Sequence, residues 1–271
     1  MAKLVAVNRY YAPDHSATAQ LLTDLGEHLV ASGQPVTAIT SRLRYDDPAA
    51  ALPARETING VLIHRVWTTR FGRTGLWGRA FDYASFYLAA TLALLLHAKR
   101  GDTILAKTDP PLISVPAALA ARLKGARLVN WCQDLYSETA AAVGVRWAKG
   151  PLGRLLRTLR NRSLKSADCN VVLCDSMFAY LESEGVPKQR LRVIHNWPDP
   201  SIRPLARSRQ PGEPFTICYS GNLGRAHNVA AIIDLIERTK DIPGLAYRFV
   251  GGGVGMGRLQ RHLSQRRITS V

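Results

Sequence analysis

The feature that most constrains the fold is an alternation of short apolar runs with longer helical segments over residues 4–195. Continuous apolar runs are typical of strands buried on both faces of a parallel sheet, and the segments between them have helical spacing. The pattern predicts strands at 4–7, 36–40, 61–67, 103–106, 127–131, 170–174 and 192–195, and helices at 18–31, 77–98, 112–124, 152–165 and 176–184. The expected fold class is therefore α/β, with a parallel sheet covered by helices on both faces.

A proline-rich stretch interrupts this pattern at residues 196–214, which contain five prolines. Proline cannot continue a helix or a central strand, so the stretch is predicted to connect two domains. A second series follows, with strands at 215–220 and 247–250 and helices at 229–239 and from 256 onwards. The predicted domains are residues 1–197, a connector at 198–214, and a second domain at 215–271. The second domain is expected to be incomplete, because an average sheet has about five or six strands.

The balance of charges limits the possible partners. The chain has 36 Lys or Arg residues against 20 Asp or Glu residues, which gives a formal net charge of +16. Residues after Gly144 carry most of this excess, with 21 basic against 9 acidic side chains. Such an excess suits phosphates, anionic lipid or nucleic acid. We expect no nucleic-acid partner, because the basic residues are not interleaved with aromatic residues and follow no helix-turn-helix pattern.

Two segments are candidates for contact with an anionic membrane surface. Residues 83–98 are uncharged but shorter than the roughly 20 residues that span a bilayer, so they predict a buried helix or one lying at a membrane surface. Residues 146–165 contain seven basic residues and no acidic one. In the helix predicted there, four leucines are expected to pack on the sheet: Leu152, Leu155, Leu156 and Leu159. The opposite face is expected to meet anionic headgroups or solvent: Arg154, Arg157, Asn161 and Lys165.

Several classes of site and cofactor are not expected. The four cysteines form no C-x-x-C pair and the histidines lack ligand spacing, so no metal site is predicted. Cys169 and Cys174 are interpreted as buried thiols of one strand. A P-loop, a nucleophile elbow and a dinucleotide fingerprint are absent, so no cofactor is predicted. The apolar stretch at the N-terminus is too short for a signal peptide, which favours a cytoplasmic location. The two candidate membrane segments place the chain there at the inner face of the plasma membrane, as a peripheral protein.

Two loops that follow strands of the second domain are candidates for binding phosphate. The first contains Gly221, Asn222, Gly224, Arg225 and His227, and the second contains Gly251, Gly252 and Gly253. Glycine lets the backbone approach a ligand closely, free amides at a helix start bind anionic oxygens, and Arg225 adds a cation suited to phosphate. In a parallel sheet both loops lie at the carboxyl edge, where ligands bind. The pattern predicts a nucleoside-diphosphate site, and the alternative is a pair of ordinary tight turns.

Six short motifs occur in the order found in a known enzyme family. They lie at residues 10–13 (YYAP), 107–112 (KTDPPL), 131–138 (WCQDLYSE), 194–199 (IHNWPD), 219–227 (YSGNLGRAH) and 249–253 (FVGGG). Together they resemble retaining family-4 glycosyltransferases, and most of all the bacterial enzymes of capsule, colanic-acid and O-antigen assembly. The resemblance implies a GT-B fold of two Rossmann-like domains and an activity that needs no metal ion.

The resemblance also implies partners and site residues. The partners would be a nucleoside-diphosphate sugar, held by the second domain, and a lipid-linked or saccharide acceptor, held by the first. Gly221 to Arg225, with His227, would line the diphosphate, and Gly251 to Gly253 would border the nucleotide. In the first domain the catalytic candidates are Asp134, Glu138 and His15, and Asn196 would approach the cleft from the connector. Three of these residues have a structural alternative. Glu138 is then an acid at a helix N-terminus, His15 an exposed loop residue and Asn196 the cap of a turn.

One departure from the family concerns the end of the chain. The family's Glu-x7-Glu signature has no counterpart after Gly253. The chain is therefore expected to be a fragment, the product of an interrupted gene, or one half of a split enzyme. The alternative function is that of a truncated, non-catalytic relative that binds a nucleotide or a partner subunit.

Overall fold

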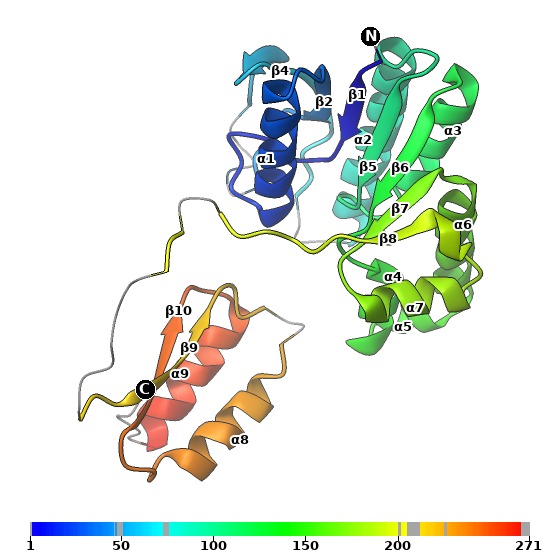
Figure 1. Cartoon of the computed structure of the whole chain (residues 1–271). Helices are drawn as coiled ribbons and strands as arrows, with labels where there is room; N and C mark the ends of the chain where they lie inside the picture. The colour runs from blue at the N-terminus through cyan, green and yellow to red at the C-terminus, as the bar shows by residue number, and fades with distance from the viewer. Residues whose placement is uncertain are drawn as a thin grey trace. The chain divides into compact units, whose positions relative to one another are not determined.

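A computed structural model describes residues 2–45, 47, 51–72, 76–199, 202–204, 212–224 and 227–266. The chain divides into two compact units (Figure 1). Unit 1 comprises Met1–Ala141 and Val145–Pro198, and unit 2 comprises Asp199–Val271 together with Ala142–Gly144. Each unit is described by itself below.

Unit 1 is built on one sheet of eight strands in the order β3-β4-β2-β1-β5-β6-β7-β8. The strands are β1 (Leu4–Val7), β2 (Val36–Ser41), β3 (Arg55–Ile58), β4 (Val61–Val66), β5 (Thr103–Lys107), β6 (Arg127–Trp131), β7 (Cys169–Val172) and β8 (Leu191–Val193). All pairs are parallel except β3 with β4. The predicted α/β class and parallel sheet are thus confirmed, whereas β3 was not predicted. This edge strand alternates exposed and half-buried residues and lacks the continuous apolar run that marks the central strands.

Helices cover both faces of this sheet. They are α1 (Ala17–Ala31), α2 (Leu76–His97), α3 (Ser114–Lys124), α4 (Tyr136–Ala142), α5 (Arg146–Lys149), α6 (Pro151–Ser166) and α7 (Asp175–Ser183), followed by a 3₁₀ turn at Lys188–Arg190. Side chains alternate between the two faces of a strand. In β1, Ala6 packs with α1, and its neighbours Val5 and Val7 pack with α2 and α3. Figure 1 shows α1 in front of the sheet and α2 behind it.

The layer of α2 and α3 lies close to the sheet because small side chains line it. Alanines of both helices, and Ala98 directly after α2, are buried in one cluster with strand residues such as Ile104: Ala90, Ala93, Ala117, Ala120 and Ala121. Phe86 and Leu94 are the large buried residues that α2 contributes. Next to α3 lies α6, joined to it by a bond of 2.7 Å between the hydroxyl groups of Ser114 and Ser163.

The packing of α6 differs from the prediction. Leu152 and Leu155 are exposed, and the buried residues of the helix are Gly153, Arg160, Ser163 and Leu164. The helix docks at its start through Gly153, where an added Cβ atom would lie 2.0 Å from the carbonyl oxygen of Ala148. Leu156 and Leu159 are half-buried, so the predicted leucine stripe is only partly in contact with the rest of unit 1. Gly153 and the ion-paired Arg160 take buried positions instead.

The prediction of two buried thiols in one strand is also wrong. Cys169 begins β7 and is half-buried. The strand ends at Val172, so Cys174 lies outside it, at the N-cap of α7. A hydrogen bond of 3.1 Å with the Ser176 hydroxyl lowers the pKa of the Cys174 thiol, and the backbone amide of Met177 adds to the effect.

Unit 2 contains two parallel strands and two helices within its described residues. The strands are β9 (Phe215–Ser220) and β10 (Leu245–Val250), and the helices are α8 (Val229–Thr239) and α9 (Val254–Arg266). The core between strands and helices contains Leu223, Ile236, Tyr247 and Leu259. Asn228 caps α8, because its side-chain oxygen accepts a hydrogen bond of 3.1 Å from the Ala231 amide.

Candidate functional site

The two glycine loops of unit 2 lie side by side at the carboxyl ends of β9 and β10. Three backbone hydrogen bonds join them: Gly221 donates to Val250 (2.9 Å), Leu223 to Gly252 (2.7 Å) and Gly255 to Leu223 (2.8 Å). The parallel pairing of Ser220 with Val250 brings both loops to the same edge of the strands. The predicted glycine loops are thus parts of one bonded structure.

Glycine is required at two positions of this structure. Gly251 has a φ of +124°, and an added Cβ atom would lie 2.1 Å from the carbonyl oxygen of Gly221. Gly253 has a φ of +112°, and its Cβ atom would lie 2.5 Å from the carbonyl oxygen of Leu223. A larger residue at either position would be strained and would push the loops apart. No atom lies within 4 Å of the Cβ position of Gly252, so this loop residue borders open space.

Backbone amides at the start of α9 are available to a ligand. Within the part of the chain that the structure describes, the amides of Gly252, Gly253 and Val254 donate no hydrogen bond. Amides at a helix N-terminus carry partial positive charge and bind anionic oxygens. The loops therefore offer a small, positively polarised surface with no side chain over Gly252.

The side chains predicted to line the diphosphate have different roles in the structure. His227 accepts a hydrogen bond of 3.1 Å from the Gly224 amide at Nδ1, which leaves Nε2 of this exposed ring as the donor in the neutral form. The side chain of Asn222 lies over Gly253, whose Cβ atom would be 2.4 Å from its Oδ1. Arg225, the predicted diphosphate cation, lies outside the described residues.

In unit 1, Asp134 and Asn196 belong to neighbouring loops. Asp134 follows β6, and the adjacent Gln133 exchanges two amide hydrogen bonds with Asn196, of 3.1 Å and 2.9 Å. Gln133 is also held by its backbone amide, which donates to the Thr108 hydroxyl (2.9 Å). Asp134 is largely exposed, but nearby atoms desolvate its carboxyl group and raise its pKa. The structure thus places Asn196 beside the loop that carries Asp134.

Glu138 lies in a different environment. Both of its carboxylate oxygens accept hydrogen bonds from Arg160 (2.6 and 2.9 Å), and Tyr180 donates a third (2.8 Å). Burial opposes ionisation, but the hydrogen bonds and charge of Arg160 outweigh it and lower the pKa of Glu138. This carboxylate therefore joins α4 to α6 and α7, a contact that the local sequence did not indicate.

His15 is not brought together with these residues. It lies exposed in the loop between β1 and α1, and no hydrogen bond or ring contact of its side chain occurs among the described residues. The preceding residue, Asp14, is buried and accepts hydrogen bonds from the backbone amides of Ser16 (2.8 Å) and Tyr45 (2.5 Å). Asp14 therefore fixes the loop, and His15 projects from it.

Sequence reasoning missed a buried lysine at the carboxyl edge of the unit 1 sheet. Lys107 ends β5, is fully buried, and its Nζ atom has no hydrogen-bond partner within the described residues. Burial lowers the pKa of Lys107 to about 7. Desolvation also raises the pKa values of the half-buried Tyr83 and Tyr87 and of the more exposed Tyr136, and the charge of Asp109 adds to this effect. The signal in the sequence was a lysine at the last position of a mainly apolar strand.

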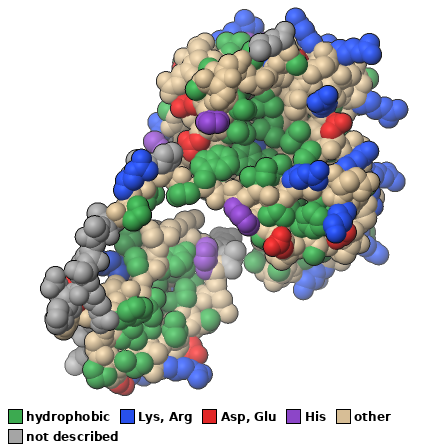
Figure 2. Space-filling view, in the orientation of Figure 1, with side chains coloured by type: hydrophobic (Ala, Val, Ile, Leu, Met, Phe, Trp, Pro, Cys, Tyr) green, Lys and Arg blue, Asp and Glu red, His purple; other side chains and the backbone are tan. Residues whose placement is uncertain are grey.

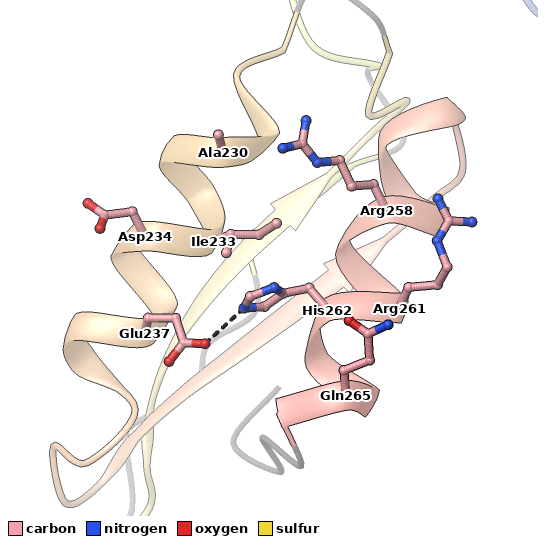
Figure 3. Close-up of a pocket in the computed structure, with 8 residues that line it drawn as sticks. All are labelled: Ala230, Ile233, Asp234, Glu237, Arg258, Arg261, His262 and Gln265. Carbon is pink, nitrogen blue, oxygen red and sulfur yellow. Dashed lines mark hydrogen bonds and ion pairs between the residues drawn. The ribbon is translucent and has the colours of Figure 1, made fainter.

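A groove of about 500 Å³ lies between α8 and α9 of unit 2, on the side of the helices away from the strands (Figure 3). Glu237 is its main anion and contacts His262 (2.8 Å), Lys240 (3.3 Å) and Arg266 (3.8 Å). The groove lies on the flank of the helices and is distinct from the glycine loops. Among the residues that the structure describes, no three His, Cys, Asp or Glu side chains are grouped to hold a metal ion.

Comparison with known proteins identifies the family. Residues 17–197, more than half of the chain, match the glycosyl transferase 4-like domain. The chain belongs to this family. The match covers most of unit 1, including the strands that position Lys107, Asp134 and Asn196.

Two curated relatives come from bacteria. The chain is 26% identical over 180 residues to "Probable glycosyltransferase WbjE" of Pseudomonas aeruginosa, an alignment that covers 64% of this chain and 45% of that protein. It is 22% identical over 287 aligned positions to "Putative colanic acid biosynthesis glycosyl transferase WcaI" of Escherichia coli K12, covering 99% of this chain and 70% of that protein. The chain thus spans less than half of the first relative's length and about two thirds of the second's.

Solved structures show the fold. Sucrose-phosphate synthase from Thermosynechococcus elongatus matches with a TM-score of 0.72 at 17% identity, covering 99% of this chain and 69% of that one. HepE from Anabaena, in complex with UDP and glucose, matches with a TM-score of 0.61 at 12% identity, covering 99% and 67%. At such identities the likeness concerns the fold alone. The family and these neighbours confirm the predicted GT-B class.

Proposed function

We propose that this chain provides the acceptor domain and the nucleotide-binding loops of a retaining glycosyltransferase of cell-surface polysaccharide synthesis. Its donor is a nucleoside-diphosphate sugar, and its acceptor is a saccharide or a lipid-linked saccharide. The observation that carries the proposal is the bonded pair of glycine loops, with free amides at Gly252, Gly253 and Val254.

The chemistry of sugar transfer explains why such loops matter. The leaving group is a diphosphate, and charge grows on it as the sugar acquires oxocarbenium character. Preorganised amides aimed at those oxygens stabilise the transition state without reorganisation. We assign the diphosphate to the amides of Gly252 and Gly253, with Gly221, Asn222 and Gly224 beside it, and the nucleotide to the edge of Gly251. Arg225 and His227 are the proposed cation and hydrogen-bond donor.

In unit 1 we assign the acceptor to the loop that follows β6. Asp134 is the proposed partner of the acceptor hydroxyl, because its carboxyl group is exposed and has a raised pKa. The Gln133–Asn196 amide pair holds this loop in place. His15 is proposed as a further acceptor or phosphate ligand. Glu138 anchors α4, the helix that follows this loop, to Arg160 of α6.

The relatives support this proposal through their names. One is named for colanic acid biosynthesis, and three HepE structures contain UDP, one of them with glucose and another as UDP-glucose. The pneumococcal O-GlcNAc transferase GtfA, matched at a TM-score of 0.52, is in complex with UDP and GlcNAc. UDP is therefore the first probe to use.

Titration calorimetry of the full chain with UDP tests the donor assignment. We expect saturable binding that weakens about tenfold or more in Gly252→Ala, because the new methyl group would cover the free amides without disturbing the fold. The matched control is Gly257→Ala in α9, whose Cβ atom meets only a distant Arg261 nitrogen at 3.9 Å. A folded chain that binds neither UDP nor another nucleoside diphosphate would refute the proposal.

A transfer assay tests the stereochemical part. With a labelled donor and a saccharide acceptor, proton NMR of the product should show the anomeric configuration of the donor. An inverted product would contradict the proposed retaining mechanism and leave the donor assignment intact.

A further inference from the structure

The outward side of α2 carries large apolar side chains that the described residues leave exposed. Trp77, Leu88, Leu92 and Leu96 are 82%, 70%, 63% and 78% exposed, and Phe81 is exposed as well. These residues recur at intervals of four and seven, so they lie on one side of the helix. At 1.5 Å per residue the stripe is about 30 Å long. We call these five residues the α2 apolar face.

The opposite side of α2 is fixed in the core of unit 1. Phe86, Ala90, Ala93 and Leu94 are buried there. Buried Asp82 holds the start of the helix, because its carboxylate accepts bonds from Thr69, Phe71 and Gly72. Among the described helices, α2 has the length and hydropathy of a membrane span, and 28% of that segment is buried. Since one side is packed on the sheet, α2 can lie along a membrane but cannot cross it alone.

The neighbouring helices continue this surface with apolar and basic residues. Leu119 and Leu123 of α3 and Leu152 and Leu155 of α6 are exposed. The exposed charged residues on these two helices are all basic: Arg122 of α3, and Arg154, Arg162 and Lys165 of α6. The three helices contain a single acidic residue, Asp82, which is buried. Their outward surface is therefore apolar and cationic and has no exposed carboxylate.

We infer that the outward surface of α2, α3 and α6 binds an anionic lipid bilayer. The α2 apolar face enters the boundary between headgroups and acyl chains, and the cations of α3 and α6 contact the phosphates. A second copy of this chain fits less well, because two identical cationic surfaces repel each other. The inference rests on the proposed function, because a lipid-linked acceptor lies in a membrane. Vesicle binding and UDP binding are measured separately, so either can fail without the other.

Sedimentation of the full chain with vesicles tests the inference. One set of vesicles contains phosphatidylcholine alone, and the other also contains phosphatidylglycerol. The test variant is the triple substitution Leu88→Gln, Leu92→Gln and Leu96→Gln, all at exposed positions. The matched control is Leu235→Gln with Ile242→Gln, which are exposed apolar residues of unit 2.

We expect the natural chain and the control to bind the phosphatidylglycerol vesicles more strongly than phosphatidylcholine alone. The triple variant should lose about tenfold in partition coefficient for each leucine replaced. Its circular dichroism and its UDP affinity should match those of the natural chain, which separates this inference from the donor assignment.

Three results would overturn the inference. In the first, the natural chain binds neither kind of vesicle. In the second, the triple variant binds the vesicles as strongly as the natural chain does. In the third case, analytical ultracentrifugation would show a dimer that the triple substitution dissociates, which would make a second copy the occupant of this surface.

Discussion

The Nζ atom of Lys107 lies 3.6 Å from the centre of the Trp131 ring, at the paired ends of β5 and β6. The lysine is fully buried, and its ammonium group has no hydrogen-bond partner among the described residues. The ring face attracts a cation, but this attraction does not replace the hydration that the ammonium group has lost. The pKa of Lys107 therefore falls to about 7, although the charge of Asp24 opposes the change.

Replacement of Lys107 by Met should stabilise unit 1 in mild acid. Below the folded-state pKa of about 7 the buried lysine is charged, and its desolvation cost is fully present. As the pH rises towards 10.5, the folded state releases the proton and the unfolded state keeps it, so stability rises with pH. At pH 6, Lys107→Met should raise the free energy of unfolding by on the order of 2 kcal/mol.

Urea unfolding at pH 6 and pH 9.5 measures this difference. The gain from Lys107→Met should shrink at the higher pH, whereas Lys188→Met, at an exposed lysine, should change stability little at either pH. A gain that is the same at both values would mean that Lys107 does not titrate in this range.

Gly251→Ala should disrupt unit 2. The new Cβ atom would lie 2.1 Å from the Gly221 carbonyl oxygen at a φ of +124°, so the loops must separate. We expect a loss of roughly 2–4 kcal/mol in the stability of unit 2 and faster hydrogen exchange in α9. Gly252→Ala is the control for stability, because its Cβ atom meets nothing within 4 Å. Equal exchange rates in the two variants would disprove the close contact of the loops.

Glu138→Gln should weaken unit 1 without a direct effect on nucleotide binding. The substitution removes a charged acceptor from Arg160 and Tyr180, at a cost of about 2 kcal/mol. Because the pKa of Glu138 is lowered, its contribution is present above the ordinary range of glutamate and is lost as the pH falls through the folded-state value. The melting temperatures of wild type and variant should therefore differ at pH 7 and should differ less in acid. Glu182→Gln, at an exposed residue of α7, should leave the melting temperature unchanged.

Asp134→Asn should impair sugar transfer and spare UDP binding. If the Asp134 carboxylate accepts a hydrogen bond from the acceptor hydroxyl, loss of its charge should lower kcat by about 100-fold. In the unchanged protein the raised pKa of Asp134 predicts that activity declines on the acid side at a higher pH than an ordinary aspartate would give. Initial rates across pH, together with UDP calorimetry, check both points. Normal transfer rates in this variant would show that another residue contacts the acceptor.

Several elements of the fold were predictable from local apolar pattern alone, including β9, whose residues are mostly exposed. The expected ranges of β1, β6, β9 and α8 are identical to those observed. The edge strand β3 and the short helices α4 and α5 were given no predicted range, because exposed strands and short helices carry little apolar periodicity. The helix-start alternative for Glu138 agrees with its place in the first turn of α4. The leucine side of α6 was assigned wrongly for Leu152 and Leu155, since Gly153 and Arg160 make buried contacts through partners that lie elsewhere in the fold.

The candidate site also has parts that the sequence predicted and parts that it did not. The contact between the glycine loops could be predicted, because strand ends in a parallel pair must meet at one edge. The reciprocal bonds of Asn196 with Gln133 join residues 63 positions apart, and no local pattern encodes that distance. The burial of Lys107 likewise depends on Trp131 and on α1, so the sequence showed a strand end and not a desolvated amine.

The alanine-lined contact between α2 and the sheet has a consequence for the leucines on the other side of the helix. A turn of α2 about its axis would bring Leu88, Leu92 and Leu96 to positions shaped for Ala90 and Ala93. Interiors have no spare volume for such an exchange, and forced insertion of extra methylene groups costs about 1–3 kcal/mol at each site. The helix therefore has one rotational setting, and its leucines must stay on the outside whether or not lipid is present. A detergent or lipid requirement during purification would then reflect the resting form of the protein and not damage to it.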